Sequence, residues 1–574
     1  MSSSLSGSSS TRRAFLTTGV VTVAGLAAAA RRLHAASAVD PASLVQSHAV
    51  PLTAQMRRHA PSAWWPELPT VEQFRALAHA AMGAARQAGA EFADIRIGLQ
   101  RQFSAGDSWS IGADFQTTLG YGIRARVNGG WSAQHGVLLS EDAVVAAARM
   151  AVARARAASA ENTRLARGAA AVAEMAPVPV ATGEWHGPMQ IDPFLVPLDD
   201  LLTLLDSWAK AGPRYGYVDI VARAKWIADT RVFASTDGAL VTQQCMQAFP
   251  SLGAGATLPD NWDDSVGVAV AGIGPVSGGY ELLLDPDIPN RIPAAAEEAI
   301  RLRQLPLIPF GDIGRYPVVF AEGAFATLVG KTISPALDGD RIAGFEADAS
   351  GGSFLAPLSA RPDASAPAFA PSLTVTTHRA LPSVAAVGWD DDGVVPEAYT
   401  LIDRGTIVDL HTTRDTAPVV SDWYRQRGQP LRSRGCAVAT TASRIPVGGA
   451  GHVTVVPAPE KAPIIDLIRD IPFGFVLRGA MASASPNVTV SAVHTSSVLV
   501  VRHGREVGRI KWLNLSVVTK QAFGAKLVAL GDASTNSTQI VEVEKGMPWQ
   551  TLAQPVTAPA ALCKEVDIVR ENLV

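Results

Sequence analysis

The sequence predicts an α+β protein with an α/β N-terminal half and a β-rich C-terminal half. Residues 70–88 carry apolar side chains at the spacing of one helix face, and residues 92–102 then alternate between apolar and polar side chains. From residue 316 onward, short apolar segments separated by glycine-containing turns predict a series of strands. The chain has 574 residues, 48% of them hydrophobic, which is enough for a large core in two or more domains.

Charge and cysteine usage narrow the function classes. The net charge is −3, and no Lys/Arg-rich tract is present, so nothing indicates binding to nucleic acid. Cys245, Cys436 and Cys563 lie far apart and form no CxxC pair. The sequence therefore predicts buried or indifferent thiols and no disulfide framework.

The N-terminus resembles a twin-arginine (Tat) export signal over residues 1–38. Arg12 and Arg13 form the arginine pair, and Phe15 and Leu16 supply the apolar pair that follows it. Such a segment is an address and is set apart before the fold is considered. It predicts a bacterial protein that is exported through the Tat system to the periplasm.

The rest of this N-terminal region fits the same interpretation. Residues 14–30 are uncharged and moderately apolar, and residues 36–38 offer a small-residue cleavage site. An uncut segment that anchors the chain in the membrane is the alternative. No other segment reaches the 18 uncharged apolar residues of a spanning helix, so no stable span is expected after cleavage. Residues 39–69 are polar and unpatterned and predict a linker.

Residues 70–310 predict an α/β domain. Thr70 is the expected N-cap of its first helix, Gly89 follows the end of that helix, and residues 92–102 are expected to form a half-buried strand. The same periodicities predict further strands over residues 120–127, 218–226 and 231–234, and further helices over residues 140–157, 198–211 and the end of 285–302, the last capped near Pro293.

Residues 311–574 predict a β-rich domain. Its expected strands cover residues 318–320, 399–403, 406–411, 453–456, 475–478, 497–502 and 510–517. A helix is expected to start near Glu322, directly after the first of these strands. Residues 347–371 are rich in Ala, Ser, Pro and Gly and predict a loop.

Short segments in both halves resemble the motifs of one family, in the family's order. They are Ala93-Asp94-Ile95-Arg96, Gly120-Tyr121-Gly122-Ile123-Arg124-Ala125, Asp192-Pro193-Phe194 with Val196-Pro197-Leu198, Ser235-Thr236-Asp237-Gly238, Asp391-Asp392-Gly393-Val394-Val395-Pro396, Leu401-Ile402-Asp403-Arg404-Gly405-Thr406-Ile407, and residues 559–569. Through these segments the chain resembles the TldD/PmbA metallopeptidase family from about residue 70 to the C-terminus.

The resemblance implies a two-lobed fold and dimers, often of two different paralogues, that enclose a cavity for unfolded peptides. Active members carry an HExxxH motif on a helix that follows a strand. In that motif two histidines bind zinc and a glutamate serves as general base.

At the motif position this chain has no zinc-binding chemistry. By the resemblance, Gly330 and Pro335 replace the two histidines, and Lys331 replaces the general base. Gly and Pro offer no side-chain donor, a lysine cation repels a metal, and Pro335 is expected to break the helix. Asp338 is the only acidic remnant. No catalytic residue, metal ligand or cofactor is therefore expected here, although active relatives use zinc.

Other metal sites find little support in the sequence. No two of the eleven histidines lie within five residues of each other. The cysteine that often completes the family's metal site would lie near residues 540–548, and that stretch has none. A zinc site assembled from distant residues stays open as an alternative.

Two local patterns imitate other sites. Gly330-Lys331-Thr332 ends like a phosphate-binding loop, but Phe325 stands where that loop begins with glycine. Asp390-Asp391-Asp392-Gly393 lacks the spacing and the closing glutamate of a calcium loop, so a solvated acidic turn is expected.

Three functions remain. The first is a non-catalytic, PmbA-like subunit that binds peptides and pairs with an active zinc-bearing paralogue, or with itself. The second is a peptidase or other hydrolase with a relocated site. The third is a free-standing periplasmic binding protein. The first is favoured, because the resemblance implies a precedent: the PmbA branch of the family lacks the motif in the same way.

Overall fold

The computed structural model describes residues 68–107, 111–164, 174–211, 218–258, 261–356, 368–495 and 497–569. The proposed export signal, with Arg12, Arg13, Phe15 and Leu16, and almost all of the proposed linker lie outside the described residues. Among the residues that are described, no helix is long and apolar enough to cross a membrane.

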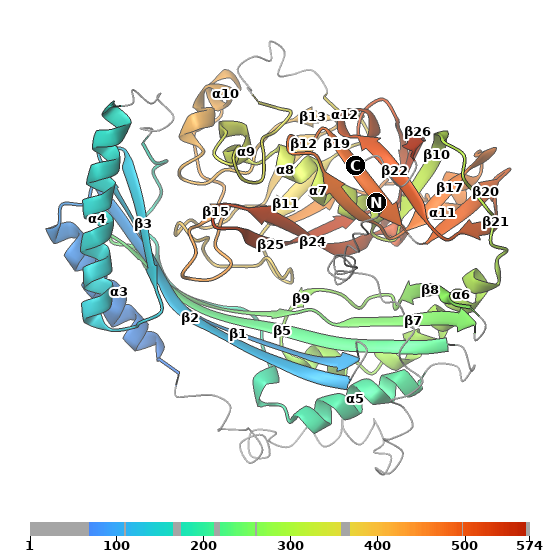
Figure 1. The fold of residues 1–574 in the computed structure, drawn as a ribbon, viewed down its shortest axis with the longest axis horizontal. Coiled ribbons are helices and arrows are strands. Elements are labelled where there is room, and N and C mark those ends of the chain that lie inside the picture. The colour runs from blue at the N-terminus through green and yellow to red at the C-terminus, as the bar shows by residue number, and fades with distance from the viewer. Residues whose placement is uncertain are drawn as a thin grey trace, which may run out of the picture.

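The N-terminal lobe is a long, bent sheet with helices on its convex side (Figure 1). Its strands are β1 Phe92–Asp107, β2 Ile111–Val127, β3 Gly130–Gly136, β4 Thr182–His186, β5 Val218–Ser235, β6 Leu240–Ala248, β7 Ser251–Leu258, β8 Asn261–Ala269 and β9 Val276–Ser277. Its helices are α3 Val71–Gln87, α4 Glu141–Arg164, α5 Leu198–Lys210 and α6 Ile288–Gln304, with short 3-10 turns at Pro193–Leu195 and Tyr280–Leu284. The strand order is β3-β2-β1-β5-β6-β4, while β7 pairs with β5 and β8, and β9 pairs with β6.

Two hydrophobic clusters hold these helices to the sheet. At one end, α3 and α4 pack on alternate side chains of β1, among them Ile95 and Ile97. At the other end, α5 and α6 pack around Phe103 and Trp226. The capping box predicted at the start of α3 is present, because Thr70 Oγ1 accepts from the backbone of Gln73 at 3.2 Å while the Gln73 side chain accepts from Thr70 at 2.8 Å.

The C-terminal lobe contains most of the strands, as the sequence predicts. They are β10 Gly314–Ala321, β11 Val375–His378, β12 Tyr399–Asp403, β13 Thr406–Ile407, β14 Ala437–Val438, β15 Val447–Gly448, β16 His452–Val455, β17 Phe473–Arg478, β18 Met481–Ala484, β19 Val490–Thr495, β20 Val498–Arg502, β21 Arg505–Ile510, β22 Leu513–Val518, β23 Leu527–Leu530, β24 Ser537–Lys545, β25 Gln550–Ala558 and β26 Ala561–Ile568. Its helices are α7 Ala324–Lys331, α8 Ile333–Ala336, α9 Gly339–Ala343, α10 Ser421–Gln426, α11 Ile464–Ile468 and α12 Thr519–Ala522, with 3-10 turns at Pro418–Val420 and Ala533–Thr535.

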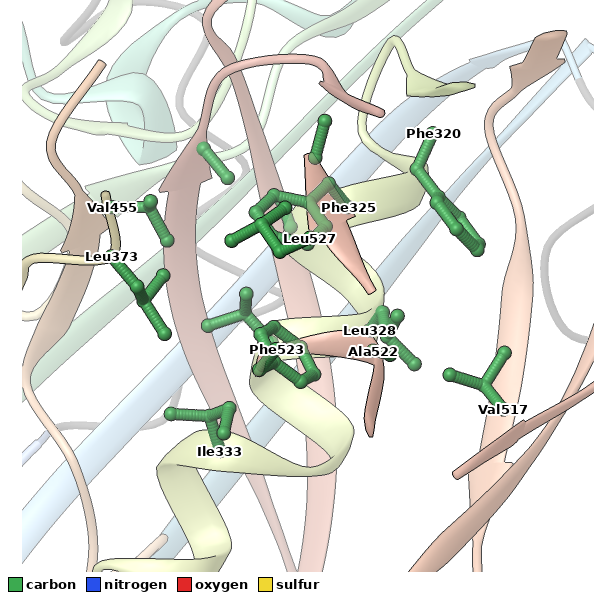
Figure 2. Packing of buried hydrophobic residues seen from close by; sticks show 14 of the residues in the cluster. Phe320, Phe325, Leu328, Ile333, Leu373, Val455, Val517, Ala522, Phe523 and Leu527 are labelled. Atoms are coloured by element: carbon green, nitrogen blue, oxygen red, sulfur yellow. The ribbon is translucent and has the colours of Figure 1, made fainter. Parts of the chain in front are cut away.

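Two sheets of this lobe enclose one core. A nine-stranded sheet has the order β18-β19-β22-β26-β10-β17-β20-β21, with β23 on β26, and a six-stranded sheet has the order β13-β12-β11-β16-β25-β24. Helix α7 contributes Phe325 and Leu328 to the cluster between them, and Phe523 stacks on Phe325 at a centroid distance of 5.4 Å (Figure 2). The helix of the motif position is therefore part of the core of the lobe.

Several predicted boundaries were wrong. Residues 218–226 and 231–234 form the single strand β5, and β13 ends at Ile407. Residues 510–517 are divided between β21 and β22. Helix α6 begins at Ile288, and Pro289 occupies its first turn, where the missing N–H costs no hydrogen bond. Pro293, the predicted cap, lies in the interior of the helix. The domain boundary between residues 310 and 311 stays a prediction.

Candidate functional site

The motif position is closed by packing. Gly330 lies near the end of α7, where a Cβ atom would meet the side chain of Val541 on β24 at 2.7–2.9 Å. A histidine could not be placed there without moving the strand. Helix α7 ends at Lys331, Thr332 leaves the helical conformation (φ −127°), and α8 with Pro335 follows as a separate turn. The helix is thus interrupted, as Pro335 predicts.

Lys331 is turned to the backbone of the neighbouring strand. Its Nζ donates to the carbonyl of Glu542 at 2.5 Å. Burial lowers the pKa of Lys331, and the carboxylates of Glu542 and Glu544 partly oppose that shift. The side chain at the general-base position therefore serves as a tie between α7 and β24.

Asp338 belongs to a second buried group, the Lys545 cluster, which consists of Asp338, Asp340 and Lys545. Lys545 is fully buried, and its Nζ donates to Asp338 Oδ2 at 2.9 Å, to Asp340 Oδ1 at 2.8 Å and to the carbonyl of Gly448 at 2.6 Å. The ammonium group uses all three of its N–H donors in these contacts.

Electrostatics agree with a charged cluster. Burial alone would lower the pKa of Lys545, but the two carboxylates outweigh it and raise the pKa. Burial raises the pKa of Asp338 and of Asp340, and Lys545 opposes this. The cluster carries two carboxylates for one ammonium, and Asp338 Oδ1 is buried with no hydrogen-bond partner in the described part of the chain.

These residues do not fit zinc. A zinc site needs three or four N, S or O donors that converge, and the described residues contain no group of three His, Cys, Asp or Glu placed to do so. The carboxylates of Asp338 and Asp340 already bind a lysine cation, which repels a metal ion. Val541 fills the space beside Gly330.

A cavity of about 400 Å³ opens next to the Lys545 cluster, between the two lobes. Its N-terminal wall comes from β1, β5 and β6, and its C-terminal wall from β24, β25 and the loops around Arg379 and Asp390. Its charged lining residues are Lys225, Asp229, Arg231, Asp338, Arg379, Asp390, Asp391, Glu542 and Lys545. Cations and carboxylates are therefore mixed with apolar side chains around this space.

The polar face of the N-terminal sheet is covered by the C-terminal lobe, which corrects the prediction of a half-buried strand. Asp94 and Arg96 of β1 are 0% and 1% exposed, because residues 390–393 and 437–443 lie on that face. Gly122 of β2 permits this contact, since a Cβ there would meet the carbonyl oxygen of Ala442 at 2.7 Å.

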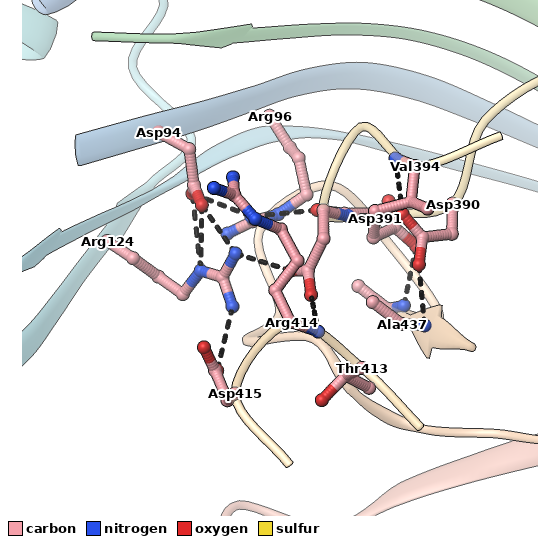
Figure 3. Close-up of polar contacts among 12 residues, drawn as sticks. Asp94, Arg96, Arg124, Asp390, Asp391, Val394, Thr413, Arg414, Asp415 and Ala437 are labelled. Atoms are coloured by element: carbon pink, nitrogen blue, oxygen red, sulfur yellow. Dashed lines mark hydrogen bonds and ion pairs between the residues drawn. The ribbon is translucent and has the colours of Figure 1, made fainter. Parts of the chain in front are cut away.

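The acidic turn at residues 390–393 is buried, and the prediction of a solvated turn was wrong. Asp392 Oδ1 accepts from Arg124 at 2.6 Å, and Asp391 pairs with Arg231, which also donates to Asp229 at 2.6 Å. We call Asp94, Arg96, Arg124, Arg231, Asp391 and Asp392 the junction cluster; Figure 3 shows most of it. The acidic turn fails as a calcium site because arginines take the carboxylates of Asp391 and Asp392, and backbone N–H groups take that of Asp390.

Burial alone would raise the pKa of Asp94, but Arg124 and Arg96 outweigh it and hold the pKa below its usual value. Among the described residues, no arginine forms an ion pair with Asp390. Its carboxylate accepts backbone N–H groups of Asp392, Val394 and Ala437 at 2.8–2.9 Å. Burial and the charge of Asp392 nevertheless raise the pKa of Asp390 to about 8.

Cys436, Tyr399 and His411 form a row of hydrogen-bonded side chains near the Lys545 cluster. The Tyr399 hydroxyl is 2.8 Å from His411 Nδ1 and 3.2 Å from Cys436 Sγ. Burial raises the pKa of Cys436 to about 11 and lowers the pKa of His411 to about 3. Burial also raises the pKa of Cys245 and of Cys563 to about 12. All three thiols are protonated at neutral pH and are poor nucleophiles.

Of the predicted site residues, the structure brings Gly330 and Lys331 against β24, and it places Asp338 in a cluster with a lysine that the sequence interpretation overlooked. Lys545 left one signal. It follows Val541 and Val543 at every second position of a strand, so its side chain was bound to point into the core. Arg379 left no such signal, because it lies in a loop whose path depends on the other lobe.

Comparison with known proteins shows which family and which solved structures this architecture resembles. Residues 313–570 match the model of the PmbA/TldA metallopeptidase C-terminal domain. No match was found among curated protein sequences. The fold and this match define a two-lobed protein whose C-terminal lobe is of the PmbA/TldA type. Over that lobe the chain belongs to the PmbA/TldD family.

Solved structures share the fold across both lobes. TldE from Thermococcus kodakarensis is 15% identical, with a TM-score of 0.60 over 86% of this chain and 100% of that one. A proposed modulator of DNA gyrase from Thermotoga maritima is 14% identical, with a TM-score of 0.61 and the same coverage. A second proposed modulator, from Bacteroides thetaiotaomicron, is 14% identical, with a TM-score of 0.58 over 87% of this chain and 99% of that one.

Proposed function

We propose that this protein is a non-catalytic, PmbA-like subunit that binds peptides and pairs with a zinc-bearing paralogue. One observation carries the proposal: Val541 occupies the space that a ligand side chain at position 330 would need. In addition, the carboxylates of Asp338 and Asp340 are both engaged by Lys545. Both features oppose zinc at the family's position, so the chain would contribute binding and shape while a partner supplies chemistry.

The cavity between the lobes supports peptide binding. Its lining offers carboxylates, cations and amide side chains, which match the N–H, C=O and charged groups of a peptide. Its volume of about 400 Å³ lies within the range of small-molecule sites. A short segment of a peptide would fill it.

An apolar patch on the C-terminal lobe supports assembly. Met547 is 66% exposed and Trp549 is 48% exposed, at the turn between β24 and β25. Phe345 and Ile445 are also exposed. Two hydrogen bonds place them beside this turn: Glu346 accepts from the backbone of Gly546 at 3.0 Å, and the carbonyl of Ile445 accepts from Gln550 at 2.7 Å. Clustered exposed apolar side chains mark interaction surfaces. A permanent partner would bury about 2,000 Å² or more and would cover this patch.

Export belongs to the same proposal. Arg12 and Arg13 would direct the folded protein, alone or with its partner, through the Tat system to the periplasm. Changing both to lysine should hold the protein in the cytoplasm, as measured by cell fractionation. An unchanged periplasmic yield would reject this route.

Metal content tests the catalytic part. The purified mature chain should hold no stoichiometric zinc after dialysis against zinc-containing buffer, and it should show no chelator-sensitive peptidase activity. Co-expression with a paralogue that carries HExxxH should give a complex with zinc and activity. One zinc per chain in the isolated protein, lost when a histidine or cysteine is changed, would overturn the proposal.

Light scattering across a dilution series tests the assembly. We expect a dimeric mass, more stable with the paralogue than alone. The double variant Met547→Ser/Trp549→Ser should dissociate it, whereas Val528→Ser, at a similarly exposed valine away from the patch, should not. A monomeric mass in every sample would instead favour the free-standing binding protein.

A further inference from the structure

Several charged residues around the cavity are satisfied by one another or by the backbone. Arg231 is held by Asp229 and Asp391, and Lys545 is held by Asp338 and Asp340. Asp390 receives three backbone N–H groups. The polar atoms of lining residues that have no hydrogen-bond partner are therefore informative, because a buried polar atom without a partner points to a missing ligand or water.

Two atoms of opposite kind remain open in the wall of the cavity. Asp338 Oδ1 is an acceptor that is buried without a hydrogen-bond partner among the described residues, while Oδ2 of the same carboxylate is bound to Lys545. Arg379 Nε is a donor in the same state, while Arg379 Nη2 donates to the carbonyl of Gly449 at 2.9 Å. Both residues line the cavity.

These two atoms lie on opposite sides of one short segment. Lys545 Nζ, which holds Asp338, binds the carbonyl of Gly448, and Arg379 binds the carbonyl of the next residue, Gly449. The charges of Asp338 and Arg379 both act on the pKa of the thiol of Cys436, in opposite directions. A carboxylate, through Lys545, and a guanidinium are thus attached to consecutive residues of one segment, both residues line the cavity, and each has one unused position.

We propose that the cavity binds a small α-amino-acid zwitterion, either a free amino acid or a dipeptide, with its ammonium group on Asp338 and its carboxylate on Arg379. An ammonium group can donate to Oδ1, and a carboxylate can accept from Nε, so both open atoms would be satisfied by one molecule. The volume of about 400 Å³ holds a dipeptide but not a long chain.

This inference rests on the proposed peptide-binding role and narrows it from internal peptide segments to free termini. It does not depend on zinc or on a paralogue. In an exported protein such a site would retain the small products of a peptidase rather than select its substrates.

Calorimetric titration of the full-length mature protein tests the inference with L-alanine, L-alanyl-L-alanine and three blocked forms of the dipeptide: N-acetylated, C-amidated and blocked at both ends. We expect the free zwitterions to bind. Each single block should weaken binding about 10- to 100-fold, because a charge-assisted hydrogen bond is lost. This comparison uses only the wild-type protein, so it holds even if a variant fails to fold.

Variants assign the two ends. Asp338→Asn should remove the preference for a free amine, and Arg379→Gln the preference for a free carboxylate. Glu542→Gln and Lys225→Gln are the matched controls, because they change the same charges at other lining positions, and they should bind like the wild type.

Equal binding of blocked and free dipeptides, no binding of any zwitterion at millimolar concentration, or equal losses in the controls would overturn the inference. A hexapeptide blocked at both ends separates the two proposals. If it binds while the free dipeptide does not, peptide binding stands and recognition of termini falls. If neither binds, both fall.

Discussion

The junction cluster and the Lys545 cluster both bury aspartates against cations, but the cation differs between them. In the junction cluster, guanidinium groups of Arg96, Arg124 and Arg231 lie between the carboxylates of the two lobes. In the Lys545 cluster, one ammonium group serves two carboxylates, and Asp338 keeps one oxygen unpartnered among the described residues. The first cluster has as many arginines as aspartates, and the second has one cation for two aspartates; both contribute residues to the wall of the cavity.

The difference between the clusters shows how the choice of cation decides whether a buried aspartate serves the structure or stays available for binding. Arginine has five N–H donors in a rigid fork, so one side chain can join carboxylates of two lobes. Lysine has three donors on a single nitrogen, and here Asp338, Asp340 and Gly448 use all of them. The next hydrogen bond to Asp338 must come from another molecule. Four predictions test this comparison.

The largest effect is expected from Arg124→Met. This change leaves Asp392 without its cation and Asp94 with only Arg96, inside a region that water does not reach. Removing one partner of a buried ion pair costs about 3–5 kcal/mol, which chemical denaturation can measure. Arg425→Met removes an exposed pair with Asp422 and should change stability by less than about 1 kcal/mol. Similar losses in both variants would contradict a structural role of the junction cluster.

Lys545→Met should cost less, about 2–3 kcal/mol, because the carboxylates it abandons border a cavity and can take up a proton. Adding Asp340→Asn should recover part of that loss, since fewer charges are left unpaired. Urea denaturation of the single and double variants forms a cycle that isolates the pair. Additive losses would show that Lys545 and Asp340 do not interact.

A matched pair of glycines tests the closure of the motif position. Gly330→Ala should destabilise the protein by about 1–2 kcal/mol, because its Cβ would meet Val541 at 2.7 Å. Gly83→Ala in α3, where a Cβ meets nothing within 4 Å, should stabilise it by up to about 1 kcal/mol. Thermal melting of both variants is the measurement. A stabilised Gly330→Ala would show that the position has room for a ligand.

The pH dependence of the free energy of unfolding should give the smallest effect, when it is expressed per pH unit. The pKa of His411 is about 3 in the folded protein and about 6.5 when unfolded, so the unfolded state binds more protons between these values. The stabilisation is complete above pH 6.5 and declines as the pH falls towards 3, by about 1 kcal/mol per unit. His411→Gln keeps an acceptor for Tyr399 and should show a flatter profile. Identical profiles would refute the buried neutral imidazole.

Local patterns in the sequence carried the elements. Helix α3, its cap at Thr70 and the strand with Ile95 and Ile97 follow from periodicity and capping, which depend on neighbours along the chain. The family resemblance placed the motif position at Gly330, on a helix that follows a strand. The same patterns separated an α/β half from a β-rich half, because composition and spacing change along the chain.

The partners of the charged residues were not available from the sequence. Asp390-Asp391-Asp392 reads as a solvated turn until the N-terminal sheet supplies Arg124 and Arg231, more than 150 residues away in the chain. The strand with Asp94 and Arg96 reads as half-buried until the other lobe covers it. Burial of a charge depends on which surface meets it, and that is a property of the packed chain.

The sequence by itself determined the fold class and the order of most elements, and its family resemblance predicted that Gly330, Lys331 and Pro335 replace zinc-binding side chains. Only the tertiary structure decided what fills the place of that chemistry: Val541 against Gly330, Lys545 between two aspartates, and a cavity with two open polar atoms. The physical reason is the range of the interactions. Periodicity and side-chain chemistry act within a few residues, whereas packing and charge pairing join strands that are hundreds of residues apart.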